Sequence, residues 1–460
     1  MIETPSADSL GKAANLSGWI PPKPTDSIPL FDPLKISAIT LQNRLLDGTL
    51  TSVQILKEYY RQILSYNGYL RAIHQLAPGA IERAEYLDDL RRRGVVLGPL
   101  HGIPVLLKDN IGTDQSMGMD TTAGSVALVG SVTINNAPIV DQELMWFKGH
   151  KVSVGWSSLC GQGQNPYIKG GVDPSDGLSG HSSPGGSSSG SGIAVAAGFA
   201  PLSIGTETEG SINCPATRNS LYAVKPTLGA VSNRSIVPIS MHLDTAGPMG
   251  INAEDVANLL TVLVGSGRPD VPPGGYRAAM SGADGWKDLD IGVLDPEIWR
   301  YDHTLQTVRP NAIEQIVSIF GFLQRQRPSL TLVQKQATFD AYGRIEALAR
   351  SYHYGVSLRP NKDFDWEGSN SVIQLMIADF ARDFDKYLED NPGQESIEEA
   401  VAFPQSSDRR DKLLRHISEV GKSFPETLDR YNINVIIGPA DSWFTKYSAA
   451  TGENNENFFP

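Results

Sequence analysis

GGSSSGSG at residues 185–192 and GTETEGSINCPA at residues 205–216 are the two stretches that decide how this chain folds. Both are dense in small residues, and glycine–serine composition alone is typical of a flexible linker. The residues between them favour another interpretation, because 193–200 has the composition of a small-residue helix and 202–204 that of a short strand. Loops that alternate tightly with helices and strands are usually held in place by them. We therefore expect two ordered loops.

A third stretch, GIPVLLKDN at residues 102–110, contains the apolar run 103–107. A short apolar run of this kind is consistent with a buried strand, which would deliver Lys108 to its end. Burial disfavours the charged form of lysine, so a buried Lys108 would become a base. An ordinary lysine at a strand end instead keeps its ammonium in water, and this alternative stays open.

Serine chemistry is suggested by the two small-residue loops. A serine hydroxyl is a weak nucleophile and needs a base to take its proton. Glycine-flanked backbone can point successive N–H groups at one spot, as an oxyanion hole requires. The segment 208–211 offers such donors around Ser211, although an ordinary turn would have the same composition.

A rival nucleophile is Ser188, at the centre of a G-x-S-x-G pattern over residues 186–190. That pattern marks a nucleophile elbow only when a strand comes directly before the serine. The preceding residues 181–185 read HSSPG, which cannot form a central strand. His181 and His242 have no aspartate at an informative spacing, so a Ser-His-Asp hydrolase is disfavoured.

Composition narrows the class of protein. With 460 residues, the chain is long enough for one large α/β domain or for two domains that share a cleft. A net charge of −12 argues against nucleic acid as a partner. Two cysteines, Cys160 and Cys214, cannot build a disulfide framework or a four-thiolate metal site, and the eight histidines form no zinc motif.

No membrane segment is expected, because no apolar run reaches the length that a bilayer requires. The first residues, MIETPSADSLGKAANLSGWI, lack the basic-then-apolar order of a signal peptide. We therefore expect a cytoplasmic globular enzyme.

Helix and strand signals continue along the chain. Thr51 and Gln54 form a capping-box pattern ahead of an apolar stripe, and a second helix is expected from Ala80 to Arg93, ending at Gly94. Later helices are expected at 310–326, 337–352 and 371–390, with a strand at 433–437.

Taken together and in order, the three stretches resemble the fingerprint of the amidase signature family: a GIPxxxKD stretch, a GGSSxGS loop and a GTxTxGSIxxPA loop. The resemblance continues through AVKPTLGAVS at 223–232 and DTAGPMG at 244–250, and it covers roughly residues 36–135 and 160–265. Chance agreement of all three blocks in this order is very improbable.

The resemblance implies an α/β fold with a mixed, largely parallel central sheet, covered by helices on both faces, and loops at one rim that form the site. It also implies a Ser–cis-Ser–Lys triad in which Ser211 is the nucleophile, Ser187 is the middle serine on a cis peptide and Lys108 is the general base. Ser188 would help to hold Lys108. The oxyanion hole would consist of the backbone N–H groups of Thr208, Glu209, Gly210 and Ser211.

The function implied is hydrolysis of the carbon–nitrogen bond of a small or aliphatic amide through a serine acyl-enzyme, with no cofactor and no metal. The expected partner is a small-molecule amide, with no nucleic acid or membrane, and a homodimer is left open. Two alternatives remain: a catalytically silent amidase-fold binding protein, and a protein similar to the glutamyl-tRNA amidotransferase subunit that carries the same signature.

The residues after the nucleophile bear on this choice. The family usually has arginine two positions after the nucleophile, whereas this chain has Asn213 followed by Cys214. This difference favours stand-alone amidases over the amidotransferase subunit. Glu207 and Glu209 add negative charge that would disfavour anionic substrates, unless they are ordinary solvated loop carboxylates.

Two further departures concern the sheet. Residues 141–155 read DQELMWFKGHKVSVG and look shortened by a family strand, and the chain stops at TGENNENFFP where the family continues. Four regions follow from this comparison. They are an extended arm at 1–34, the signature core at 35–270, a variable helical substrate-side region at 271–430, and the start of a truncated C-terminal part of the core at 431–460.

Overall fold

The computed structural model of the chain defines the surroundings of all three stretches. It describes residues 28–130, 133, 153–174, 180–299 (without 266, 270, 281 and 297), 332–391, 407–439 and 442–451. Four sequence expectations fall wholly or largely outside these residues: the arm at 1–34, the shortened stretch at 141–155, the helix at 310–326 and the end of the chain.

The three stretches meet on a mixed four-stranded sheet. Its strands are β1 (Val105–Leu107), β4 (Leu202–Glu207), β6 (Thr245–Gly250) and β5 (Tyr222–Ala223), in the order β1-β4-β6-β5. β1 pairs with β4 in parallel, while β6 runs antiparallel to both β4 and β5. The mixed sheet expected from the sequence is confirmed, with one parallel and two antiparallel pairings.

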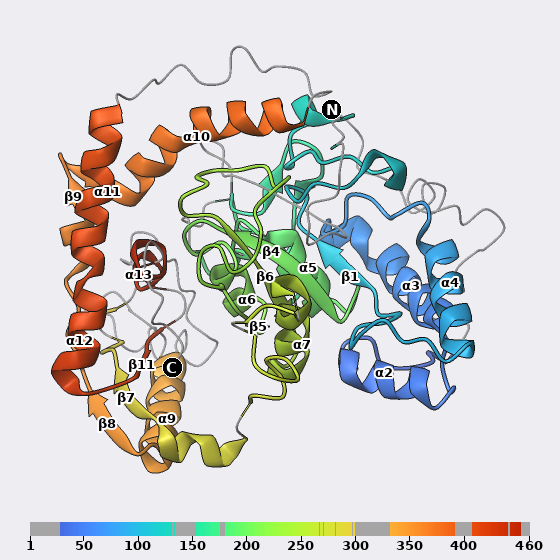
Figure 1. The fold of residues 1–460 in the computed structure, drawn as a ribbon, viewed down its shortest axis with the longest axis horizontal. Helices are drawn as coiled ribbons and strands as arrows, with labels where there is room; N and C mark the ends of the chain where they lie inside the picture. The colour runs from blue at the N-terminus through green and yellow to red at the C-terminus, as the bar shows by residue number, and fades with distance from the viewer. Residues whose placement is uncertain are drawn as a thin grey trace, which may run out of the picture.

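Both faces of this sheet are covered, since every residue of β4 and β6 is buried. On one face lies α5 (Ser189–Ala196), where Ser191 Oγ donates to the Ile204 carbonyl and Ser203 Oγ donates to the Ser191 carbonyl. On the other face, Leu202 and Ile204 belong to one apolar cluster with Leu259 of α7 (Ala253–Val264). Figure 1 shows α5 and α7 beside the central strands. The α/β class is therefore confirmed.

Three N-terminal helices complete that core: α2 (Ala38–Leu46), α3 (Ser52–Leu70) and α4 (Ala80–Arg92). The expected capping box is present, because Thr51 accepts from the Gln54 N–H and Gln54 accepts from the Thr51 N–H. Two buried aspartates tie the helices together. Asp88 of α4 accepts from the first N–H groups of α3, and Asp255 of α7 accepts from those of α2.

A second sheet lies beyond residue 265, with strand order β11-β7-β8 and parallel pairing throughout. Its strands are β7 (Asp290–Val293), β8 (Ser351–Tyr354) and β11 (Val435–Ile437). The expected strand at 433–437 therefore exists as β11, but among the described strands it pairs with β7 in this second sheet and not with the first sheet. The cause is that an apolar run has no partner preference of its own, so its sheet cannot be read from periodicity.

Helices cover the second sheet and arch beside the first (Figure 1). They are α9 (Leu332–Leu348), α10 (Ser371–Asp390), α11 (Ser407–Gly421), α12 (Ser423–Tyr431) and α13 (Thr445–Ala450). The helix expected at 371–390 has those bounds, whereas the one expected at 337–352 ends at Leu348 because 351–354 is strand β8.

Shorter elements join these parts. They are α6 (Asn213–Arg218), the 3₁₀ turns Gln115–Met117, Val126–Leu128, Ala283–Asp288 and Asn361–Phe364, and the small strand pairs β2 (Trp156–Ser157) with β3 (Gly161–Gln162) and β9 (Asp365–Trp366) with β10 (Ser369–Asn370). None of the described helices is long and apolar enough to cross a bilayer. The four regions suggested by the sequence remain a prediction.

Candidate active site

Lys108 stands at the end of β1, in the position that the apolar run 103–107 predicts. Its side chain is only 1% exposed, and its Nζ donates to Ser187 Oγ at 2.8 Å and to the Thr206 carbonyl at 3.1 Å. Burial lowers the pKa of Lys108 to about 7, while the nearby carboxylates of Asp244 and Glu207 act in the opposite direction. The ordinary lysine that keeps its charge in water is therefore excluded, and a neutral amine is available near pH 7.

Ser187 follows a cis peptide bond between Gly186 and Ser187, as the resemblance implied. The loop that carries it needs glycine at position 185, where φ is +74° and a Cβ would lie 2.8 Å from Pro215. Asn219 holds the same loop by donating from Nδ2 to the Pro184 carbonyl at 2.8 Å. The glycine–serine stretch is therefore an ordered loop, as its surroundings predict.

Ser188 is fully buried rather than presented to a substrate. Its hydroxyl donates to the Thr206 carbonyl at 3.1 Å and accepts from the Thr206 N–H at 3.2 Å. It supports Lys108 only indirectly, because both side chains donate to that carbonyl. Residues 180–188 form no strand, so the elbow interpretation fails on geometry as well.

Ser211 lies after β4 on a tight loop in which Gly210 has a φ of +77°. It is partly exposed, and its carbonyl accepts from the Ser188 N–H at 3.1 Å, so the two small-residue loops are joined directly. No hydrogen bond between the hydroxyls of Ser187 and Ser211 occurs within the described residues. Catalytic hydrogen bonds are often long before substrate binds, and the bond from the Ser188 N–H to the Ser211 carbonyl holds the two loops next to each other.

The main-chain donors around Ser211 are open. In the described part of the chain, the N–H groups of Glu209, Gly210 and Ser211 donate to no other protein group. The next two N–H groups, of Ile212 and Asn213, donate instead to the carboxylate of Glu207 at 2.7 and 3.0 Å. The loop thus leaves three successive N–H groups, those of residues 209–211, without a protein acceptor among the described residues and beside the candidate nucleophile, as an oxyanion site requires.

The two loop glutamates are not the ordinary solvated carboxylates that the sequence left open as an alternative. Glu207 is 1% exposed and caps the turn after Ser211, so it is not a solvated loop carboxylate. Glu209 is part-buried and accepts from Thr445 Oγ1 of α13 at 2.7 Å, and burial raises the pKa of Glu209. Both carboxylates are engaged by protein donors.

Asp244 and Lys225 are functional candidates that the sequence reasoning did not single out, although both lie in stretches that resemble the family. Asp244 accepts from Thr208 Oγ1, and burial raises the pKa of Asp244 to about 6. Lys225 donates to the Ser448 carbonyl at 2.9 Å, and burial lowers the pKa of Lys225. The sequence signal that could have pointed to them is their position inside the stretches 223–232 and 244–250, which resemble the family.

Among the residues that the structure describes, no three His, Cys, Asp or Glu side chains gather as a metal site.

The structure has an α/β fold, and it pairs a buried lysine with a serine that follows a cis peptide bond. The signature stretches led us to expect both features in an amide-cleaving enzyme. The sequence model of the family named Amidase matches residues 54–316, more than half of the chain. The chain therefore belongs to the amidase family.

Known relatives agree with this assignment. The chain is 35% identical over 286 residues to a probable amidase of Arabidopsis thaliana, covering 56% of this chain and 53% of that protein. It is 38% identical over 252 residues to a glutamyl-tRNA(Gln) amidotransferase subunit of Symbiobacterium thermophilum, covering 52% and 49%. The chain thus spans about half the length of these two relatives. The solved native peptide amidase of Stenotrophomonas maltophilia is 26% identical with a TM-score of 0.67, covering 90% of this chain and 88% of that one.

Proposed function

We propose that this chain hydrolyses the carbon–nitrogen bond of a small or aliphatic amide through an acyl-enzyme on Ser211. The observation that carries the proposal is the buried Lys108 Nζ, 2.8 Å from the hydroxyl of Ser187. A lysine whose pKa is about 7 is deprotonated often enough at neutral pH to accept a proton.

The proposed reaction begins with a proton relay. Neutral Lys108 takes a proton from Ser187, and Ser187 takes one from Ser211 as the Ser211 oxygen attacks the amide carbonyl. The carbonyl oxygen becomes an oxyanion, which the N–H groups of residues 208–211 would hold. The relay then returns the proton to the leaving nitrogen, the carbon–nitrogen bond breaks, and water cleaves the acyl-enzyme by the same steps.

A second candidate is a protein similar to the glutamyl-tRNA(Gln) amidotransferase subunit, favoured by 38% identity over 252 residues. Asn213, where the family usually has arginine, speaks against this candidate. The catalytically silent binding protein is disfavoured by the arrangement of Lys108 and Ser187, which a silent protein has no need to keep.

The test is covalent labelling of the purified chain with a fluorophosphonate, read by intact mass and by peptide mapping. Labelling at Ser211 that disappears in Ser211→Ala and survives in Ser188→Ala supports the proposal. Labelling that survives Ser211→Ala refutes the assigned nucleophile. Ammonia release from short aliphatic amides and from C-terminally amidated peptides then ranks the substrates. Turnover by the isolated chain separates an amidase from an amidotransferase component, which would need partner subunits.

A further inference from the structure

The turn at residues 239–244, hereafter the 239–244 turn, is folded around the carboxylate of its own last residue. Asp244 Oδ2 accepts from the N–H groups of Ile239 and Ser240 at 2.8 and 3.1 Å. The Ser240 carbonyl accepts in return from the N–H groups of Leu243 and Asp244 at 2.9 and 2.8 Å. Ser240 is fully buried and Asp244 is 7% exposed, so the turn has little freedom to rearrange.

The inner side of this turn holds the loop of the proposed nucleophile. The second carboxylate oxygen of Asp244, Oδ1, accepts from the hydroxyl of Thr208. Thr208 is 3% exposed and comes directly after β4, three positions before Ser211. The hydroxyl of Thr208 therefore fixes the start of the segment whose N–H groups would hold the oxyanion.

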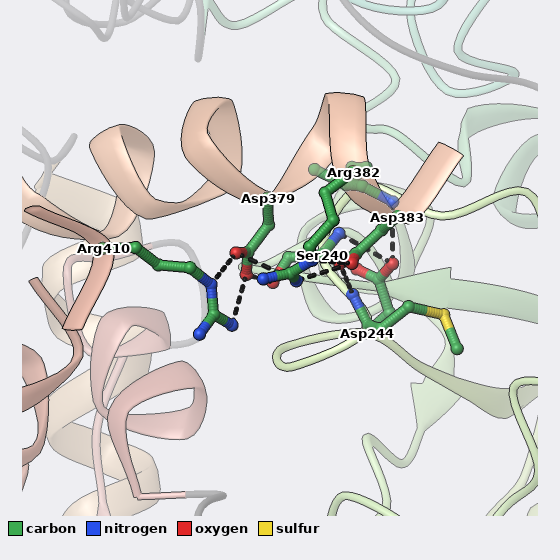
Figure 2. Close-up of polar contacts among 8 residues, drawn as sticks. Ser240, Asp244, Asp379, Arg382, Asp383 and Arg410 are labelled. Atoms are coloured by element: carbon green, nitrogen blue, oxygen red, sulfur yellow. Dashed lines mark hydrogen bonds and ion pairs between the residues drawn. The ribbon is translucent and has the colours of Figure 1, made fainter. Parts of the chain in front are cut away.

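The outer side of the 239–244 turn is held by α10, as Figure 2 shows. Ser240 Oγ donates to Asp379 Oδ2 at 2.6 Å, although the two residues are 139 positions apart in sequence. One helical turn further along α10, Asp383 accepts from the Met241 N–H at 2.7 Å. Two carboxylates on one face of α10 thus fasten two successive residues of the turn.

Asp379 is itself fixed by cations. It has no exposed side-chain surface, and Arg410 of α11 donates to both of its carboxylate oxygens. Arg382 lies 3.1 Å from the same carboxylate and also pairs with Asp383 (Figure 2). A buried carboxylate without such partners would be costly, and these arginines hold Asp379 in place.

We propose that Asp379 and Asp244 are positioning residues for the nucleophile loop 205–211, acting in series through Ser240 and Thr208. This proposal rests on the proposed function of that loop. Oxyanion donors stabilise a transition state only when they are placed before charge develops, and a displacement of about 1 Å costs on the order of 10²-fold in rate. Helix α10, which lies outside every signature stretch, would thereby set the geometry of the signature loop.

The test is a double-mutant cycle between Ser240→Ala, which removes the link to Asp379, and Thr208→Val, which removes the link to Asp244. Each change should lower kcat on the order of tenfold with little change in KM, and the double variant should be no slower than Thr208→Val alone, because both break one path. Arg409→Gln is the matched control. It breaks α11 contacts with Glu367 and Gln374 and should leave kcat unchanged.

Hydrogen exchange of peptides covering 205–216 gives a readout that needs no substrate. Exchange at Ile212, Asn213 and Cys214, whose amides bond within this loop, should quicken in Ser240→Ala but not in Arg409→Gln. The proposal is overturned if Ser240→Ala keeps kcat within about twofold of the parent chain, or if the losses multiply in the double variant. If the parent chain neither reacts with the fluorophosphonate nor turns over an amide, the proposed function fails. Separately, hydrogen exchange that is unchanged in Ser240→Ala overturns the positioning role.

Discussion

Replacing Lys108 by methionine should make the protein inactive and more stable at pH 7. Methionine has a similar length and needs no proton removed on folding, whereas Lys108 must fold with a pKa of about 7 instead of 10.5. At about 1.4 kcal/mol for each tenfold change in the proton equilibrium, that requirement costs roughly 4 kcal/mol at pH 7.

Two hydrogen bonds offset part of this cost. Lys108 donates to Ser187 and to the Thr206 carbonyl, and each bond contributes about 1 kcal/mol. The Thr206 carbonyl keeps the hydroxyl of Ser188 as a donor after the substitution, so no buried acceptor is stranded. Lys108→Met should therefore raise the free energy of unfolding by roughly 2 kcal/mol at pH 7, a trade of activity for stability.

The sign of the pH dependence makes this prediction specific. The folded pKa of Lys108 is lowered, so between pH 7 and 10.5 the unfolded chain binds more protons and the parent protein gains stability as pH rises. The advantage of Lys108→Met must shrink over the same window. Urea unfolding at several pH values measures it, with Lys35→Met, an exposed lysine, as control. A Lys108→Met variant that is less stable at pH 7, or whose advantage is independent of pH, would refute the reasoning.

Three more outcomes are expected. Ser211→Ala should abolish probe labelling and amide turnover while circular dichroism and the thermal midpoint stay near those of the parent. Activity should rise with pH through about 7, as Lys108 loses its proton. Lys108→Arg should be as damaging as Lys108→Ala, because a guanidinium does not give up its proton. Substantial activity in the arginine variant would rule out a base at this position. Gly185→Ala should lower the thermal midpoint and the labelling rate together, because the alanine Cβ would lie 2.8 Å from Pro215 at a backbone φ of +74°. An unchanged labelling rate would contradict the assigned loop geometry.

Local signals in the sequence were enough to predict the burial of one candidate site residue and several features of the helices. An apolar run of five residues predicted that Lys108 would be buried, and it is. The capping residues Thr51 and Gln54 and the helix at 371–390 were also found from patterns that act within a few positions. In each case the physical cause lies in neighbours along the chain, which a single sequence records.

The parts that sequence reasoning missed depend on residues that are distant in the chain. The strand 435–437 pairs with β7, and nothing in its composition distinguishes that partner from β1 or β4. The capping role of Glu207 cannot be read from its neighbours in sequence, because the N–H groups of Ile212 and Asn213 reach it only after the loop has turned back. No role for Asp379 could be read from the sequence, since that role is defined by contacts with Ser240 and Arg410.

The carboxylates of Asp244 and Glu207 keep the pKa of Lys108 near neutrality, because they oppose the effect of burial. Burial alone disfavours the ammonium, and the carboxylates of Asp244 and Glu207 oppose that effect. A general base is most effective when its pKa is close to the working pH, because it must be free to accept a proton and still acidic enough to return it. The donors that hold Asp244 and Glu207 in place therefore do more than fold a loop. They keep both carboxylates near Lys108, where the carboxylates raise its pKa toward the range in which the proposed relay can work.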